Sequence, residues 1–218
     1  MIYIIVLSFF VLSLLTINII YSIDLKIDKK VSNNILILLP NMIIPILIYT
    51  KYDMNVQTLS YIMLVPFLTL ISIIDFRTSY VYDITILSGI IMQCIIFLPC
   101  LLNYDRYLNL NWVNNFRGLL VGVVLSYIVA KTTKAMGEGD IGFYGLCSFV
   151  IGGEYTLYMM MLSFVLASIY GLCILISKKA SLKSTIPFTP FISLSTILIM
   201  LTEWDMINFY FDILGNYL

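Results

Sequence analysis

Apolar residues dominate this 218-residue chain and fall into long segments separated by short polar stretches. The eight segments cover residues 2–22, 35–50, 59–74, 84–103, 117–130, 141–151, 157–177 and 186–202. Several are shorter than the roughly 20 residues that cross the hydrocarbon layer as a helix, so we expect their helices to extend into flanking polar residues. The pattern predicts an all-α polytopic membrane protein with about eight transmembrane helices.

The organisation between these segments is simple. The connections are short, and none has the composition of a linker, so residues 1–218 are expected to form a single integral-membrane domain. Met1 to Ser22 lacks a basic start and a small-residue cleavage site. We therefore expect it to be a retained span and not a removable signal peptide.

Composition narrows the possible functions. Charged residues make up 11% of the chain against about 25% in soluble proteins, and the mean hydropathy is +1.02. The net charge is zero and no basic run occurs, so nucleic-acid binding has no electrostatic support. Histidine is absent, which excludes Ser-His-Asp triads, Cys-His dyads and His-containing zinc sites. The cysteines, Cys94, Cys100, Cys147 and Cys173, lie in apolar segments without a CxxC pair, so we expect core residues, no metal and no cofactor.

The positive charges predict an orientation. Nine of the 12 Lys and Arg residues lie in alternate connections: Lys26, Lys29, Lys30, Arg77, Lys131, Lys134, Lys178, Lys179 and Lys183. The remaining three are Lys51, Arg106 and Arg117. Positive residues favour the cytoplasmic side. We therefore expect loops 23–34, 75–83, 131–140 and 178–185 in the cytoplasm, with both termini outside, in a multi-pass protein of the cytoplasmic membrane.

A carboxylate flanked by glycine lies at the start of one apolar stretch, in Gly137-Glu138-Gly139-Asp140. Residues 135–153 contain no Lys or Arg and are numerous enough to cross the hydrocarbon layer as one span. Asp140 would then lie about 7 Å inside that span. An ionisable group at such a position is costly, which indicates a functional site. Glycine beside Glu138 permits close approach of another backbone, such as a substrate strand.

A second acid is expected at the same membrane face. Asp75 ends the third apolar segment, and the predicted topology places it at a depth comparable to that of Asp140. Two converging carboxylates can share a proton, one acting as a base towards water and the other as an acid towards a carbonyl. The residues alone leave a structural role open, as well as a small ion- or proton-coupled transporter using Asp75 and Asp140.

Three short elements resemble a known family. Residues 75–83 (DFRTSYVYD) are similar to the Asp-x-(Arg/Lys)-x-x-x-(Ile/Val)-Pro-(Asp/Asn) element of type IV prepilin and preflagellin peptidases. Residues 137–140 (GEGD) resemble their Gly-x-Gly-Asp motif, and residues 186–191 (IPFTPF) resemble the Ile-Pro-Phe-Gly-Pro-Phe element that opens their last helix. The resemblance covers about residues 60–200, the expected catalytic core.

The resemblance implies a membrane-embedded aspartic endopeptidase of the Gly-x-Gly-Asp type, with Asp75 and Asp140 as the catalytic pair. Its implied partners are membrane lipid and prepilin-like precursors, which are cut at the cytoplasmic face between a basic leader and an apolar helix. No nucleic acid is expected. Supporting or substrate-binding residues would be Arg77, Asp83, Gly137, Glu138, Gly139, Pro187, Phe188 and Pro190.

The chain departs from the family pattern at several points. Tyr82 stands where a proline is usual, and Gly142 stands where a lysine commonly follows the motif. Loop 23–34 contains no cysteine, so the resemblance does not extend to the methyltransferase part of bifunctional members. Tyr82-Asp83 also resembles presenilin and signal peptide peptidase, although we expect Asp83 to be a helix-start or turn acid. Pro187 and Pro190 suit a helix start as well as a cleft lining.

Overall fold

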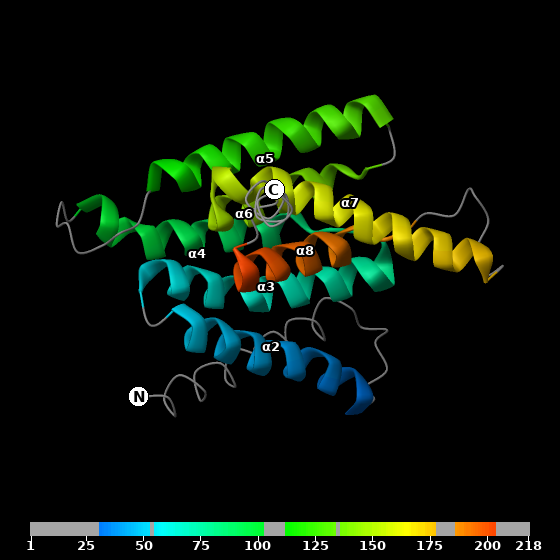
Figure 1. Cartoon of the computed structure of the whole chain (residues 1–218), viewed down its shortest axis with the longest axis horizontal. Helices are drawn as coiled ribbons and strands as arrows, with labels where there is room; N and C mark the ends of the chain where they lie inside the picture. The colour runs from blue at the N-terminus through cyan, green and yellow to red at the C-terminus, as the bar shows by residue number, and fades with distance from the viewer. Residues whose placement is uncertain (1–30, 53–54, 103–111, 134–135, 178–185, 204–218) are drawn as a thin grey trace, which may run out of the picture. The chain divides into compact units, whose positions relative to one another are not determined.

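The computed structural model describes residues 31–52, 55–102, 112–133, 136–177 and 186–203, and these form helices (Figure 1). The helices are α2 (Val31–Tyr52), α3 (Val56–Thr78), α4 (Asp83–Leu102), α5 (Trp112–Thr133), α6 (Glu138–Ile151), α7 (Gly153–Ile176) and α8 (Thr189–Thr202). Each coincides with one of the predicted segments that follow the first, so the all-α prediction is confirmed for this part of the chain. The first predicted span lies outside the described residues.

Three of the described helices, α3, α5 and α7, are long and apolar enough to cross a membrane. Helices α6 and α8 contain 14 residues each, which is shorter than a full span. The described residues therefore support a membrane protein, whereas the total of about eight transmembrane helices stays a prediction.

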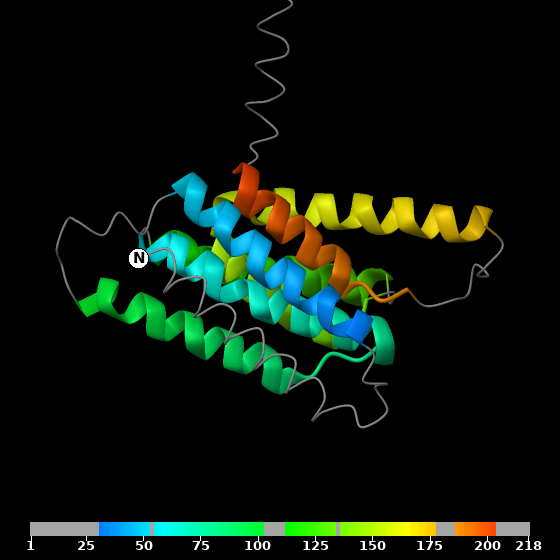
Figure 2. The same cartoon turned by 90° about the horizontal axis from the view of Figure 1, so that it is seen from below.

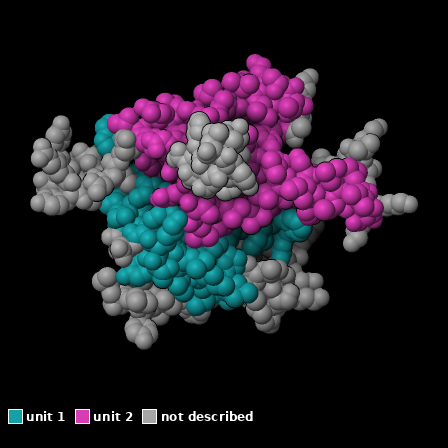
Figure 3. Space-filling model, viewed as in Figure 1, with its two compact units in different colours: residues 1–112 teal, residues 113–218 magenta. Residues whose placement is uncertain are grey.

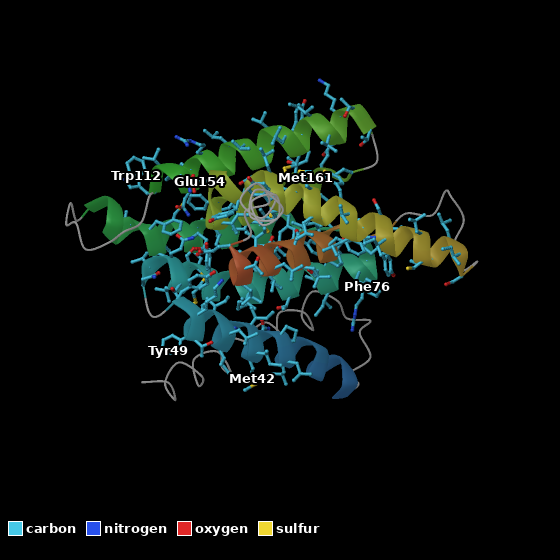
Figure 4. All side chains as sticks on the ribbon, viewed as in Figure 1. Met42, Tyr49, Phe76, Trp112, Glu154 and Met161 are labelled. Atoms are coloured by element: carbon cyan, nitrogen blue, oxygen red, sulfur yellow. The ribbon has the colours of Figure 1, made fainter. Side chains whose placement is uncertain are left out.

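Exposed apolar stripes agree with a membrane setting. Along α7 the exposed large apolar residues follow one another at intervals of three or four: Leu157, Met161, Val165, Ile169, Leu172 and Ile176. That spacing places them on one helix face, with Met161 labelled in Figure 4. A continuous apolar stripe of this kind suits contact with lipid better than contact with water.

The chain divides into two compact units, residues 1–112 and residues 113–218 (Figure 3). In the first unit, α3 packs against both α2 and α4. Buried polar side chains join these helices: Ser60 Oγ donates to Gln93 Oε1 at 2.7 Å, and Gln93 Nε2 returns a bond to the Ser60 carbonyl oxygen at 3.2 Å. Thr69 Oγ1 lies 3.1 Å from Asn41 Oδ1 of α2. Such bonds specify the register between helices that are otherwise apolar.

In the second unit, α6, α7 and α8 pack pairwise, and α8 runs beside α7 (Figure 2). Helix α5 contributes a buried face of small and polar residues, Asn115, Gly118, Gly122 and Ser126. A Cβ atom added at Gly118 would overlap the carbonyl oxygen of Ser148, so the α5 backbone touches α6 directly. Close approach through small residues at intervals of four is a usual packing mode in membranes.

Helix α6 ends at Ile151, as the apolar segment 141–151 predicts. Gly152 adopts φ +86, which ends the helix, and its N–H bonds to the Ser148 carbonyl oxygen at 2.9 Å. Helix α7 begins at the next residue, with the exposed Glu154 in its first turn (Figure 4). The prediction of one continuous span over 135–153, with Asp140 about 7 Å inside it, is therefore wrong, because the helix starts at Glu138 and a glycine in this conformation ends it after Ile151.

Candidate active site

Asp75 lies in the last turn of α3, with 5% of its surface exposed. The helix ends just after it, where Ser79 adopts the left-handed conformation (φ 53) and donates its N–H to the Asp75 carbonyl oxygen at 2.7 Å. The following residues, Phe76 and Arg77, are exposed, and Phe76 lies at the end of α3 in Figure 4. The helix end therefore places the Asp75 side chain on the buried face while its neighbours face outward.

Asp140 lies in the first turn of α6, with 7% of its surface exposed. Its Oδ2 accepts a hydrogen bond from the Gly137 N–H at 3.2 Å, which satisfies a backbone donor that the helix leaves unpaired. The carboxylate therefore lies at the positive end of the α6 dipole, where negative charge is stabilised. A Cβ atom added at Gly137 would lie 3.6 Å from Asp140 Oδ2, an ordinary contact. Steric fit therefore does not explain the glycine at this position.

Burial separates these two acids from the others that the structure describes. The carboxylates of Asp83, Glu138, Glu154 and Glu203 are exposed, whereas Asp75 and Asp140 are buried. Burying a carboxylate is costly unless other groups compensate for the lost water. The chain therefore retains two costly groups, both at the ends of helices.

The remaining predicted site residues of these helices lie near the surface. Arg77 is exposed in the last turn of α3, and Asp83 begins α4, as expected for a helix-start acid. Glu138 opens α6 and is exposed, and Gly139 next to it is half-buried. Hydrogen bonding brings Gly137 and Asp140 together, as described above.

The predicted Pro-Phe segment meets the helix that carries Asp140. Pro187 and Phe188 precede α8, and Pro190 lies in its first turn, as predicted for a helix start. The Phe188 ring lies 6.2 Å from the Tyr144 ring of α6 and 5.3 Å from the Phe164 ring of α7. Tyr144 follows Asp140 by one helical turn and lies on the same helix face. Unit 2 therefore places Phe188 within reach of the part of α6 next to Asp140.

Sequence reasoning missed several residues that hold α6 in place. Asn115 Nδ2 donates to the carbonyl oxygens of Phe149 and Val150, at 2.9 and 3.3 Å, which satisfies the end of α6. The Tyr144 hydroxyl bonds to Ser163 of α7. The interval of four between Gly118 and Gly122 was a usable signal for the α5 packing face. No local pattern signals the Tyr144 bond, which depends on tertiary structure.

The two acids belong to different units, Asp75 to the first and Asp140 to the second. Their convergence at one site stays a prediction. Among the described residues, no group of three or more His, Cys, Asp or Glu side chains could hold a metal ion. The expectation of core cysteines is confirmed for Cys147, which is buried, and is wrong for Cys94 and Cys173, whose free thiols are exposed.

Comparison with known proteins identifies the family. The model of the type IV leader peptidase family matches residues 62–172, just over half of the chain. The chain is also 27% identical over 101 residues to a protein of Bacillus subtilis (strain 168) described as a prepilin leader peptidase/N-methyltransferase. That alignment covers 46% of this chain and 41% of the relative. No solved structure matches. The chain belongs to the type IV leader peptidase family.

Proposed function

We propose that this chain is a membrane-embedded aspartic endopeptidase that removes the leader peptide of prepilin-like precursors. The family match and the prepilin leader peptidase of B. subtilis support leader cleavage as the activity. The N-methyltransferase activity in that relative's name is not part of the proposal, because the alignment covers 41% of the relative.

One observation carries the aspartic mechanism. The family-matched region, residues 62–172, contains Asp75 and Asp140, which are the buried carboxylates among the described residues. The exposed Asp83 lies in the same region but resembles an ordinary solvated helix-start acid. Buried ionisable groups within membrane segments are usually functional. Burial therefore favours the pair Asp75 and Asp140 over a pair that includes Asp83.

In the proposed mechanism, the two carboxyl groups share one proton and hold a water molecule between them. The ionised carboxylate accepts a proton from the water as the oxygen attacks the scissile carbonyl carbon. The protonated member donates to the carbonyl oxygen, and collapse of the tetrahedral intermediate transfers a proton to the leaving amine. Asp140 suits the ionised role because it accepts the Gly137 N–H at the positive end of α6.

Substrate binding follows from the surroundings of the acids. The exposed Glu138 lies beside Asp140 and offers a negative charge to the cationic leader. The apolar helix of the precursor would remain in the lipid against the apolar faces of the protein. The helix must unwind at the cleavage point, because a helical peptide bond is shielded by its own backbone. We propose that the site faces the cytoplasm in the cytoplasmic membrane, since Asp75 and Asp140 lie in or next to the connections that carry most of the Lys and Arg residues, and such connections favour the cytoplasmic side.

Co-expression with a prepilin-like precursor tests the proposal. Leader removal is measured by the mass of the precursor isolated from membranes. We expect wild-type protein to remove the leader, and Asp75→Asn and Asp140→Asn to abolish removal although both proteins reach the membrane. Asp83→Asn is the matched control, an exposed acid of the same kind, and should retain substantial activity. Cleavage by Asp140→Asn at the wild-type rate would rule out the mechanism.

A further inference from the structure

The first half of α6 has little intrinsic tendency to be helical. It contains Gly139, Gly142 and Gly145 within seven residues, after Gly137 at the N-cap. Each glycine inside a helix costs about 1 kcal/mol relative to alanine. The geometry of Asp140 therefore depends on the contacts that other helices make with α6.

Tyr144 supplies such a contact one turn from Asp140. Its side chain is fully buried, and its hydroxyl bonds to Ser163 Oγ of α7. Ser163 Oγ also lies 2.7 Å from the Met160 carbonyl oxygen, to which it donates its single hydrogen. The Tyr144 hydroxyl is therefore the donor in the bond to Ser163, which fixes both the direction of the phenol and the rotation of α6 about its axis.

The same side chain also contacts the segment that leads into α8. The Tyr144 ring packs at 6.2 Å from the Phe188 ring, in the segment that leads into α8. Tyr144 thus joins α6, α7 and the Pro-Phe segment at the level just below the acid.

We propose that Tyr144, anchored by Ser163, is a positioning residue that holds Asp140 in its reactive orientation. This inference rests on the proposed peptidase function, in which Asp140 activates water. Rotation of α6 about its axis would carry the Asp140 carboxylate away from the water, and the bond to Ser163 opposes that rotation. A phenylalanine at position 144 would fill the same space but could not make the bond.

The kinetic test compares purified variants with a prepilin-like precursor. Tyr144→Phe should lower kcat by about 10- to 100-fold, because small misplacements of reacting groups are costly, while KM stays within about two-fold. Ser163→Ala should do the same, and the double variant should be no worse than either single, as expected for two partners in one bond. Ser163→Thr retains the hydroxyl and should keep most of the activity.

The matched control is Tyr61→Phe, which removes another buried phenol hydroxyl from α3 in the first unit. It should leave kcat within about two-fold of wild type, since ordinary buried hydroxyls contribute to stability and not to the position of Asp140. Equal losses of kcat in Tyr144→Phe and Tyr61→Phe would overturn the inference, as would a wild-type kcat in Tyr144→Phe.

Hydrogen exchange supplies a readout that needs no substrate. Exchange of the peptide covering residues 136–143, which includes the first turn of α6, should be at least several-fold faster in Tyr144→Phe than in Tyr61→Phe. Unchanged exchange would contradict the positioning role even if the wild-type protein cleaved no precursor. Failure of the proposed function is distinct: Asp140→Asn would then behave as wild type in the cleavage assay, whatever Tyr144→Phe does.

Discussion

The α5–α6 contact allows a quantitative test of how α6 is held. In Gly118→Ala the new Cβ atom would overlap the Ser148 carbonyl oxygen and would lie 2.8 Å from the Gly152 carbonyl carbon and 2.9 Å from the Gly153 nitrogen. All three neighbours are backbone atoms, which cannot turn away as a side chain does. Helix α6 must therefore move away from α5 by a sizeable fraction of an ångström.

Overpacking of this kind costs about 1–3 kcal/mol in a well-packed interior. For a chain of this length, about 1 kcal/mol corresponds to a shift in Tm of about 2–4 °C. We therefore expect Gly118→Ala to lower the Tm by about 2–12 °C. The Tm is measured in detergent by circular dichroism. Because α6 carries Asp140, leader cleavage should fall by up to about 100-fold even below the Tm.

Gly171→Ala is the matched control for this prediction. The added Cβ atom there would lie 3.4 Å from the Cδ1 atom of Ile186, close to ordinary contact with the end of a flexible side chain. This variant should be unchanged or more stable by up to about 1 kcal/mol, because alanine favours a helix more than glycine does. An unchanged Tm and full activity in Gly118→Ala would show that α5 and α6 are not in direct contact, and would refute the reasoning.

Three further outcomes are expected. Ser60→Ala or Gln93→Leu alone should lower the free energy of unfolding by about 1–3 kcal/mol, because each leaves a buried polar partner unsatisfied. The double variant should lose less than the sum of the two, because it removes both partners. Additive losses of unfolding free energy, measured by chemical denaturation, would contradict the Ser60–Gln93 bond. Ser79→Gly should raise the Tm, because glycine removes a left-handed penalty of about 1–2 kcal/mol from the turn after Asp75; a lower Tm would argue against the turn. Leader cleavage should survive strong chelators, and loss of activity in EDTA with rescue by zinc would contradict a metal-free aspartic mechanism.

The sequence predicted the helices well because their signal is local. Apolar run length located α2 to α8, and the position of Asp83 just before an apolar segment located it at a helix start. The segment 141–151 located the end of α6, whereas the reading of residues 135–153 as one span failed because hydropathy does not register the conformation of Gly152. A Cβ atom added at Gly152 would lie 2.6 Å from Nδ2 of Asn114, a residue 38 positions earlier in the chain, so the surroundings of this glycine are tertiary and leave no local pattern.

In the candidate site, too, features with a local signal could be predicted and features that depend on tertiary structure could not. Asp75 and Asp140 could be selected from sequence because a carboxylate within an apolar segment is conspicuous. The sequence could not predict that these two acids are buried whereas Asp83 and Glu138 are exposed, because all four lie at helix ends. The Tyr144–Ser163 bond joins residues of two helices and leaves no local pattern. The predicted pairing of Asp75 with Asp140 would join residues of two units, and periodicity does not encode it.

The cleavage rates of Asp75→Asn, Asp140→Asn and the double variant test the shared site most directly. They are measured with purified protein and a prepilin-like precursor, with Asp83→Asn as the control. If the two carboxylates act as one unit, each single variant should lower the rate to background, and the double variant should be no slower than either. Cleavage by Asp75→Asn at the wild-type rate, together with an inactive Asp83→Asn, would contradict the assignment of the catalytic pair.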